Sequence, residues 1–208
     1  MVTKQILDYL FEYFPDPPDL EKKLLRQLCR ENQELPQWAA GLQRILDSLS
    51  HRNLLKRSLK LCVLKMPLNA LALPHETIVM AKSLVSLRRD YPDQLAFVLA
   101  HEAAHIELGH AREKTSLDAI TNLVTRANPP VGCAMQYLLG RAFSREQEFE
   151  ADRLAIEYCR TAGYNPRAGI AFMEWLQTIG DDTGVIQLMS THPPLGARVT
   201  RIKALTDD

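Results

Sequence analysis

Two histidines and a glutamate in the middle of the chain have the spacing of a metal-binding motif. They are His101, Glu102 and His105, in the segment LAHEAAH at residues 99–105. On a helix, residues four positions apart lie on one face, so both imidazoles can reach one metal ion. Glu102 projects beside that ion, where its carboxylate can take a proton from a bound water. The pattern predicts hydrolysis at a single catalytic zinc ion.

A catalytic zinc site needs a third protein ligand and an open position for water. An acidic run on a later helix supplies candidates, namely Glu146, Glu148 and Glu150, with Asp152 after them. Glu148 and Asp152 are four residues apart and share a helical face. One of them could bind zinc while the other accepts a hydrogen bond from a ligand histidine. Spacing alone does not choose between Glu148 and its neighbours.

The other candidate ligands are histidines outside the motif. His110 lies five residues after His105, about 140° around the helix, so we expect it to point away from the metal. The remaining three histidines are His51, His75 and His192.

Apolar runs and helical periodicity predict the elements that position these residues. Three strands are expected at residues 59–66, 70–73 and 77–80. Helices are expected at 92–114, with the HExxH motif, at 133–161, with the acidic run, at 166–180, and after Pro194. Gly163 fits the C-terminal cap of the second helix. The predicted fold class is α+β and mostly helical, with a small three-stranded sheet packed on the HExxH helix and a second metal-ligand helix.

Charge and composition exclude several classes of function. The chain has 25 basic and 25 acidic residues and zero formal charge, which argues against a nucleic-acid partner. Its four cysteines form no CxxC pair, and no G-x-S-x-G signature is present. No stretch approaches the roughly 18 apolar residues of a membrane span, and the N-terminus lacks a signal peptide's apolar run. We expect a cytoplasmic protein without a membrane span. A chain trimmed of a targeting segment would read the same way and would be periplasmic or exported.

Further segments accompany the HExxH motif. They are SR at 144–145 followed by EFEAD at 148–152, NALALP at 69–74, STHPP at 190–194 with Arg198 after it, and GYNPRA at 163–168. In this combination the chain resembles the HtpX and CAAX-prenyl-protease family of gluzincin zinc metallopeptidases, which includes Oma-like and BepA-like members. In that family HExxH is followed on a later helix by E-x-x-A-D. The family's membrane members carry spanning helices, so the chain resembles the soluble members.

The resemblance spans about residues 59–205 and implies roles for residues of this chain. It assigns Glu148 as the third zinc ligand and Asp152 as a hydrogen-bond partner of a ligand. It implies that substrate pairs along an edge strand at Asn69, Ala70, Leu71 and Ala72.

The zinc metallopeptidase domain is placed at 57–208, and residues 1–56 lie outside the resemblance. Periodicity, prolines and caps predict helices at 6–14, 19–30 and 36–57, so residues 1–56 would be an N-terminal helical region that is a regulatory or substrate-contacting appendage. The first of these helices has one apolar face, which packs on the domain or binds a membrane or a partner.

The chain departs from the family just after the edge strand. The family usually has glycine after the strand's proline, whereas His75 and Glu76 follow Pro74 here. His75 either belongs to an exposed loop or approaches the metal.

The expected mechanism uses zinc to activate a water and to polarise the scissile carbonyl. Glu102 accepts the water's proton and passes it to the leaving amine. His192 either stabilises the oxyanion or occupies the open metal position until substrate arrives; alternatively, it only caps the last helix. Arg198 orients nearby carboxylates or substrate carbonyls.

The predicted function is a zinc-dependent metalloendopeptidase with one Zn²⁺ per chain. Its polypeptide substrates are extended or unfolded segments, because strand addition needs an open backbone, and this suits protein quality control. A latent protease and a non-catalytic zinc-bound chaperone or interaction module are the alternatives. Glu102 argues against the non-catalytic module, since a structural zinc site needs no such base.

Overall fold

The computed structural model describes residues 40–50, 55, 58–64, 68–73, 76–111, 143–179, 192 and 195–207. All of them belong to one compact unit formed by residues 34–112 and 142–208. The helices expected at 6–14 and 19–30 lie outside the described residues. The helix expected at 36–57 is present in part as α3 (Ala40–Ser50).

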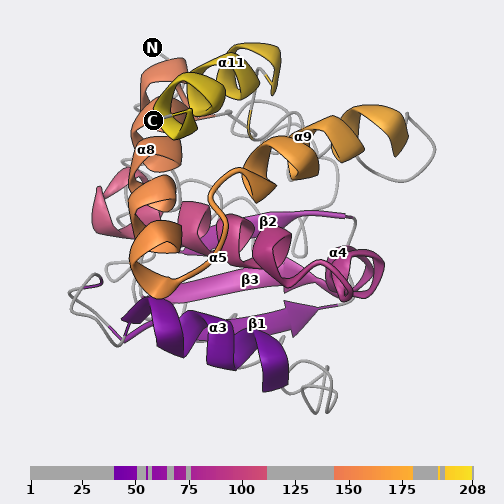
Figure 1. Ribbon diagram of the computed structural model, residues 1–208. Helices are drawn as coiled ribbons and strands as arrows, with labels where there is room; N and C mark the ends of the chain where they lie inside the picture. The colour runs from indigo at the N-terminus through magenta and orange to yellow at the C-terminus, as the bar shows by residue number, and fades with distance from the viewer. Residues whose placement is uncertain are drawn as a thin grey trace, which may run out of the picture. The chain divides into compact units, whose positions relative to one another are not determined.

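The sheet has three strands, as the apolar runs predict. They are β1 (Lys60–Leu64), β2 (Ala70–Leu73) and β3 (Thr77–Ala81). The order is β1-β3-β2, with β1 parallel and β2 antiparallel to β3 (Figure 1). β3 is buried along its whole length because it is the central strand. β2 is an outer strand, and within the described residues it pairs with β3 alone.

The connection from β2 to β3 contains a left-handed residue. Glu76 has a φ of 62°, and no other non-glycine residue of the described part has a positive φ. Glycine adopts this conformation at little cost, whereas a residue with a Cβ is strained there. The chain therefore enters β3 through a glutamate in a conformation that glycine would adopt with less strain.

Helix α5 (Pro92–Glu107) is enclosed by the rest of the unit. Every residue from Gln94 to Ile106 is buried, including the three of the HExxH motif. α5 packs on β2 and β3 on one side and on α8 and α9 on the other. The predicted end near residue 114 was wrong, because the chain turns at Gly109, which has a φ of 81°. A short helix that periodicity did not predict, α4 (Lys82–Arg88), leads into α5.

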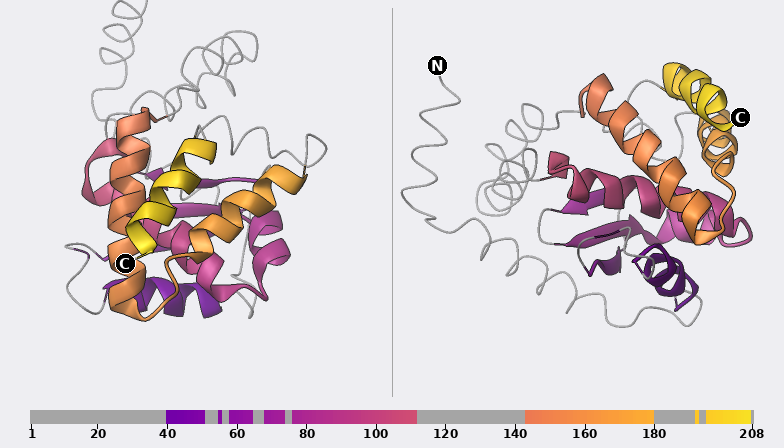
Figure 2. Two further views of the ribbon diagram at one scale, coloured as in Figure 1. Left: turned by 45° about the horizontal axis from the view of Figure 1, so that its top comes forward. Right: turned by 60° about the vertical axis from the view of Figure 1, so that its left-hand side comes forward.

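Helix α8 (Arg145–Ala162) lies beside α5 in all views (Figure 2). The predicted start near residue 133 was wrong, because Phe143 and Ser144 are not helical. Ser144 and Gln147 form a capping box in which each side chain bonds the other's backbone N–H. Gly163 ends the helix with a φ of 86°, which confirms the predicted C-terminal cap.

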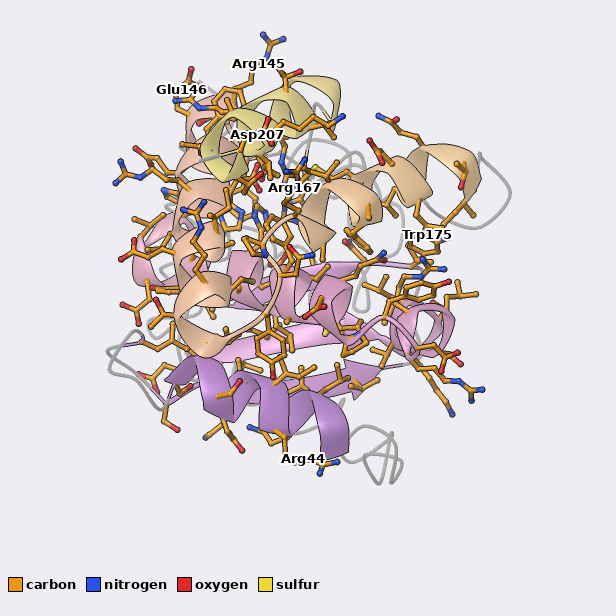
Figure 3. All side chains as sticks on the ribbon, in the orientation of Figure 1. Arg44, Arg145, Glu146, Arg167, Trp175 and Asp207 are labelled. Carbon is orange, nitrogen blue, oxygen red and sulfur yellow. The ribbon has the colours of Figure 1, made fainter. Side chains whose placement is uncertain are left out.

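Two further helices complete the unit, α9 (Ala168–Ile179) and α11 (Leu195–Thr206), both close to their predicted positions. An ion pair of 2.9 Å joins Arg167, just before α9, to Asp207 after α11 (Figure 3). The guanidinium of Arg88 lies 3.8 Å from the ring centroid of Trp175, which ties α4 to α9. The mostly helical α+β fold with a small sheet is thus confirmed. No helix among the described residues has the length and apolar character to cross a bilayer.

Close packing of α9 on α5 depends on Gly169. A Cβ at this position would lie 2.5 Å from the Phe97 ring. We expect Gly169→Ala to lower the free energy of unfolding by about 1–3 kcal/mol, the usual cost of overpacking a core. Chemical denaturation measures this change. Gly41→Ala in α3 is the matched control, because a Cβ there meets nothing within 4 Å. Equal stability of the two variants would contradict the predicted packing.

Candidate metal centre

The motif histidines project from α5 into the interior of the protein. His101 is 5% exposed, Glu102 2% and His105 0%. Because α5 is mostly apolar and buried on all sides, these polar side chains have no access to water. Their hydrogen-bond partners must therefore come from neighbouring elements. Those neighbours are α8 and the segment that leads into α11.

Helix α8 contributes Glu148 and Asp152 from adjacent turns of one buried face. The capping box places Glu148 in the first turn, with its carboxyl group fully buried. His192, just before α11, and Arg198, in its first turn, are each 4% exposed. Seven side chains from three parts of the sequence therefore meet at one place: His101, Glu102, His105, Glu148, Asp152, His192 and Arg198.

Four of these side chains have the geometry of a metal site. One ligand atom each from His101, His105, Glu148 and His192 lie within 4.8 Å of one another. The Nε2 atoms of His101 and His105 are 3.1 Å apart. His192 Nδ1 lies 3.4 Å from His101 Nε2 and 3.0 Å from Glu148 Oε1. A tetrahedral ion with bonds of about 2.0–2.1 Å places its ligand atoms about 3.4 Å apart. The donor atoms therefore fit one such ion.

Unpaired polar atoms at the same place also fit a cation. Glu102 Oε2 and His192 Nε2 are buried and have no hydrogen-bond partner within the part of the chain that the structure describes. Glu102 Oε1 lies 3.6 Å from His192 Nε2, so Glu102 adjoins the four-residue cluster without belonging to it.

The charges of the site are unbalanced. Among the described residues, Glu102, Glu148 and Asp152 are the buried carboxyl groups, and Arg198 is the buried guanidinium beside them. With the histidines neutral, as metal ligands must be, three carboxylates against one guanidinium leave two negative charges in excess. Buried charges are costly unless they are paired or coordinate a metal. One divalent cation would restore neutrality.

Arg198 connects the two carboxylates of α8. Its Nε and Nη2 donate to both oxygens of Asp152 at 2.7 and 2.6 Å, and its Nη1 lies 2.6 Å from Glu148 Oε2. Burial alone would raise the pKa of Asp152, but the charge and hydrogen bonds of Arg198 outweigh it and lower that pKa. Asp152 Oδ1 also lies 3.0 Å from His101 Nδ1. Asp152 thus holds the ring nitrogen of His101 that faces away from the cluster.

The protonation states of two cluster members, His105 and Glu148, favour metal binding. Burial lowers the pKa of His105 well below its ordinary value. Burial opposes ionisation of Glu148, but the charges of His192 and Arg198 outweigh it and hold its pKa well below the usual range. Burial likewise opposes protonation of His101, but its bonds to Asp152 and Glu148 raise its pKa to about 9. A metal ion at His101 must therefore displace a proton.

The surroundings of His105 contain residues that the sequence did not predict for the site. The Phe143 ring stacks on His105 with centroids 3.7 Å apart. His110 does not point away: its Nδ1 lies 3.1 Å from His105 Nδ1, although it is not one of the four clustered residues. Gly109 is the sequence feature that could have indicated this contact, because glycine often follows the end of a helix. The expected angle of 140° between His105 and His110 assumes a continuous helix, whereas α5 ends before Gly109.

The remaining predicted residues lie on or near β2. Ala70, Leu71 and Ala72 belong to this outer strand, and buried Asn69 precedes it. His51 and His75 lie outside the described residues.

A model of peptidase family M48 matches residues 36–206 of the chain. Among curated proteins, the chain is similar to the mitochondrial metalloendopeptidase OMA1 of Bos taurus. The two are 28% identical over 159 residues, which cover 66% of this chain and 30% of the relative. The Homo sapiens protein of that name gives the same identity and coverage. The Arabidopsis thaliana mitochondrial metalloendopeptidase OMA1 is 33% identical over 131 residues, covering 60% of this chain and 27% of the relative. The similarity thus spans less than a third of the length of these relatives.

We expect Glu148→Gln to weaken binding of a divalent metal by more than about 100-fold. Loss of a residue that only supports a ligand costs about 10–100-fold, and loss of a ligand should cost more. Competition with a chromophoric chelator measures the affinity. Glu146→Gln is the matched control, because it makes the same change on an exposed side chain of the same helix (Figure 3). Equal affinities for the two variants would exclude Glu148 as a ligand.

Proposed function

This chain belongs to peptidase family M48, and from that membership we propose that it is a zinc-dependent metalloendopeptidase. It hydrolyses peptide bonds in extended or unfolded segments of polypeptides. The observation that carries the proposal is the cluster of His101, His105, Glu148 and His192, with Glu102 beside it. The similar proteins named above are metalloendopeptidases, which supports the same activity here.

His101, His105 and Glu148 would hold the metal, and two imidazoles with one carboxylate make zinc the favoured ion. Bound zinc activates a water molecule and polarises the scissile carbonyl. Asp152 accepts a hydrogen bond from His101 Nδ1 and so keeps Nε2 of His101 directed at the cluster. Arg198 fixes Asp152 and Glu148 in turn.

Glu102 is the proposed general base. It is the next residue after a ligand, and its Oε2 is buried without a hydrogen-bond partner among the described residues. It accepts a proton from the attacking water and donates it to the amine that leaves. A positioned acid–base group of this kind contributes about 10²–10⁴-fold to the rate.

His192 occupies the fourth position of the cluster in the resting protein. The short distances from His192 Nδ1 to Glu148 and His101 support this position. They favour a role for His192 as a fourth ligand over stabilisation of the oxyanion. Because a catalytic site needs its fourth position open, His192 must withdraw before substrate is cleaved. The enzyme is therefore latent until this happens.

The outer strand β2 supports the preference for extended substrates. A peptide can add to an outer strand by backbone hydrogen bonds, which folded segments cannot offer. We assign this contact to Asn69, Ala70, Leu71 and Ala72. Such a preference suits protein quality control, with residues 1–56 as a regulatory or substrate-contacting region and 57–208 as the catalytic domain.

A second candidate function is a non-catalytic zinc-bound chaperone or interaction module. The observation in its favour is that the cluster consists of four protein side chains, since structural zinc sites have four protein ligands and no open position.

Cleavage of casein by three matched proteins separates the two functions. We expect Glu102→Gln to keep its zinc and to lose at least about 100-fold in kcat/KM relative to the native chain, because only the base is removed. We expect His192→Ala to cleave faster than the native chain, because its fourth position is open. Bound zinc is measured in each protein by elemental analysis. Zinc binding with no cleavage by either protein, the native chain and His192→Ala, would favour the non-catalytic module.

A further inference from the structure

A chain of contacts runs from His105, a proposed metal ligand, to the protein surface. His105 Nδ1 lies 3.1 Å from His110 Nδ1, and His110 Nε2 lies 3.2 Å from Glu150 Oε2. The side chain of His110 is 8% exposed, whereas that of Glu150 is 62% exposed. His110 therefore lies between a buried imidazole of the metal cluster and a carboxylate on the outer surface of α8.

The turn at the end of α5 makes the first of these contacts possible. On a continuous helix, the side chain of His110 would lie about 140° around the axis from that of His105. Gly109 interrupts the helix with a φ of 81°, a left-handed conformation that glycine adopts at little cost. After this turn His110 lies against His105 instead of pointing away from it.

The protons on this chain have one consistent order when a metal is bound. His105 Nε2 lies 3.1 Å from His101 Nε2 and 3.4 Å from Glu148 Oε1, so it is the nitrogen that faces the cluster. The ring proton of a metal-bound His105 is therefore on Nδ1. This N–H donates to His110 Nδ1, and a neutral His110 then carries its own proton on Nε2. That second N–H donates to the carboxylate of Glu150.

The opposite order of protons fails at both ends of the chain. It would place a proton on His105 Nε2, where it would block coordination of the metal. It would also leave His110 Nε2 without a proton, so that two acceptors, this nitrogen and the Glu150 carboxylate, would face each other at 3.2 Å. Both ends therefore select the same tautomers.

Ring packing alone does not determine which atoms of His105 face the cluster. Phe143 stacks on His105 with ring centroids 3.7 Å apart and an angle of 14° between the planes. A His105 ring turned by 180° about its Cβ–Cγ bond would stack equally well, but it would present carbon atoms to the cluster and to His110. The contact with His110 distinguishes the two orientations, because it requires a nitrogen at that position.

The other motif histidine has a partner of the same kind. Asp152 Oδ1 lies 3.0 Å from His101 Nδ1, and Arg198 donates two hydrogen bonds to Asp152. Each imidazole of the motif thus has an acceptor at the nitrogen that faces away from the cluster. Each acceptor is itself in contact with a charged side chain, which is Glu150 in the case of His110. Acceptors in this position fix the tautomer and the orientation of a ligand histidine.

We propose that His110 is a positioning residue of the metal centre, which accepts a hydrogen bond from His105 Nδ1 and so holds Nε2 of His105 toward the metal. Glu150 anchors His110 in turn. The proposal rests on the zinc site proposed above and adds to it two residues outside the four-residue cluster. The contribution of Glu150 is the smaller one, because its side chain is mostly exposed to solvent.

The affinity for Zn²⁺, measured by chelator competition, tests this role without any substrate. We expect His110→Leu to weaken zinc binding by about 10–100-fold. His110→Asn should bind zinc nearly as the native chain does. Its amide oxygen can take the place of Nδ1 and accept the same hydrogen bond, whereas leucine has the same shape and no acceptor.

The contribution of Glu150 is tested in the same assay. We expect Glu150→Ala to weaken zinc binding less than His110→Leu does. Glu146→Ala is the matched control, because it makes the same change on another exposed side chain of α8 (Figure 3), and it should leave the affinity unchanged.

Two further measurements separate positioning from packing. In excess chelator, the unfolding midpoints of His110→Leu and His110→Asn should be similar, because the ring proton of metal-free His105 is not confined to Nδ1. In the zinc-loaded native chain, nitrogen NMR of the histidine rings should show His105 bound through Nε2 with its proton on Nδ1. The ring proton of His110 should be on Nε2.

Three outcomes would overturn the positioning role. They are equal zinc affinity of His110→Leu and the native chain, an equal loss in the Leu and Asn variants, which would indicate only a packing role, and a His110 whose ring proton is on Nδ1 in the zinc-loaded chain. A native chain that binds no zinc would instead contradict the proposed metallopeptidase function, and the positioning role with it.

Discussion

The burial of charged groups at one place is the constraint on which the rest of the unit depends. The carboxyl groups of Glu102, Glu148 and Asp152 and the guanidinium of Arg198 are all buried, and all four are in contact with the histidine cluster or belong to it. Removing such groups from water costs several kcal/mol each unless they pair or bind a metal. The fold therefore has to bring α5, α8 and the start of α11 together accurately. Loss of one member would leave another charge unpaired.

The local structure of each element helps to bring these buried charged groups together. The buried helix α5 presents two imidazoles on one face, and the capping box of α8 fixes where that helix begins, so that Glu148 falls in its first turn. Arg198 joins α11 to both carboxylates of α8. On the other side of α5, the sheet offers the outer strand β2, which packs on that helix. The metal cluster and the outer strand proposed to bind substrate thus lie against one helix.

The sequence predicted what depends on local spacing. The helical geometry of HExxH, the three short strands and the glycine cap at Gly163 all follow from patterns of a few residues. Spacing did not choose Glu148 over Glu146 and Glu150, because that choice depends on which face of α8 meets α5. The family resemblance was needed to select it.

The failed predictions also have physical causes. The expected helix to residue 114 overlooked Gly109, so His110 was directed away from the site rather than against His105. The expected start of α8 at 133 overlooked the capping residues Ser144 and Gln147.

X-ray absorption at the zinc edge tests the proposed metal centre most directly. For the zinc-loaded native chain, we expect only nitrogen and oxygen neighbours at about 2.0–2.1 Å, with the outer-shell scattering of three imidazoles. In His192→Ala, the imidazole scattering should fall to that of two rings while the zinc remains bound. Sulfur neighbours at about 2.3 Å, or unchanged imidazole scattering in His192→Ala, would contradict the proposed cluster.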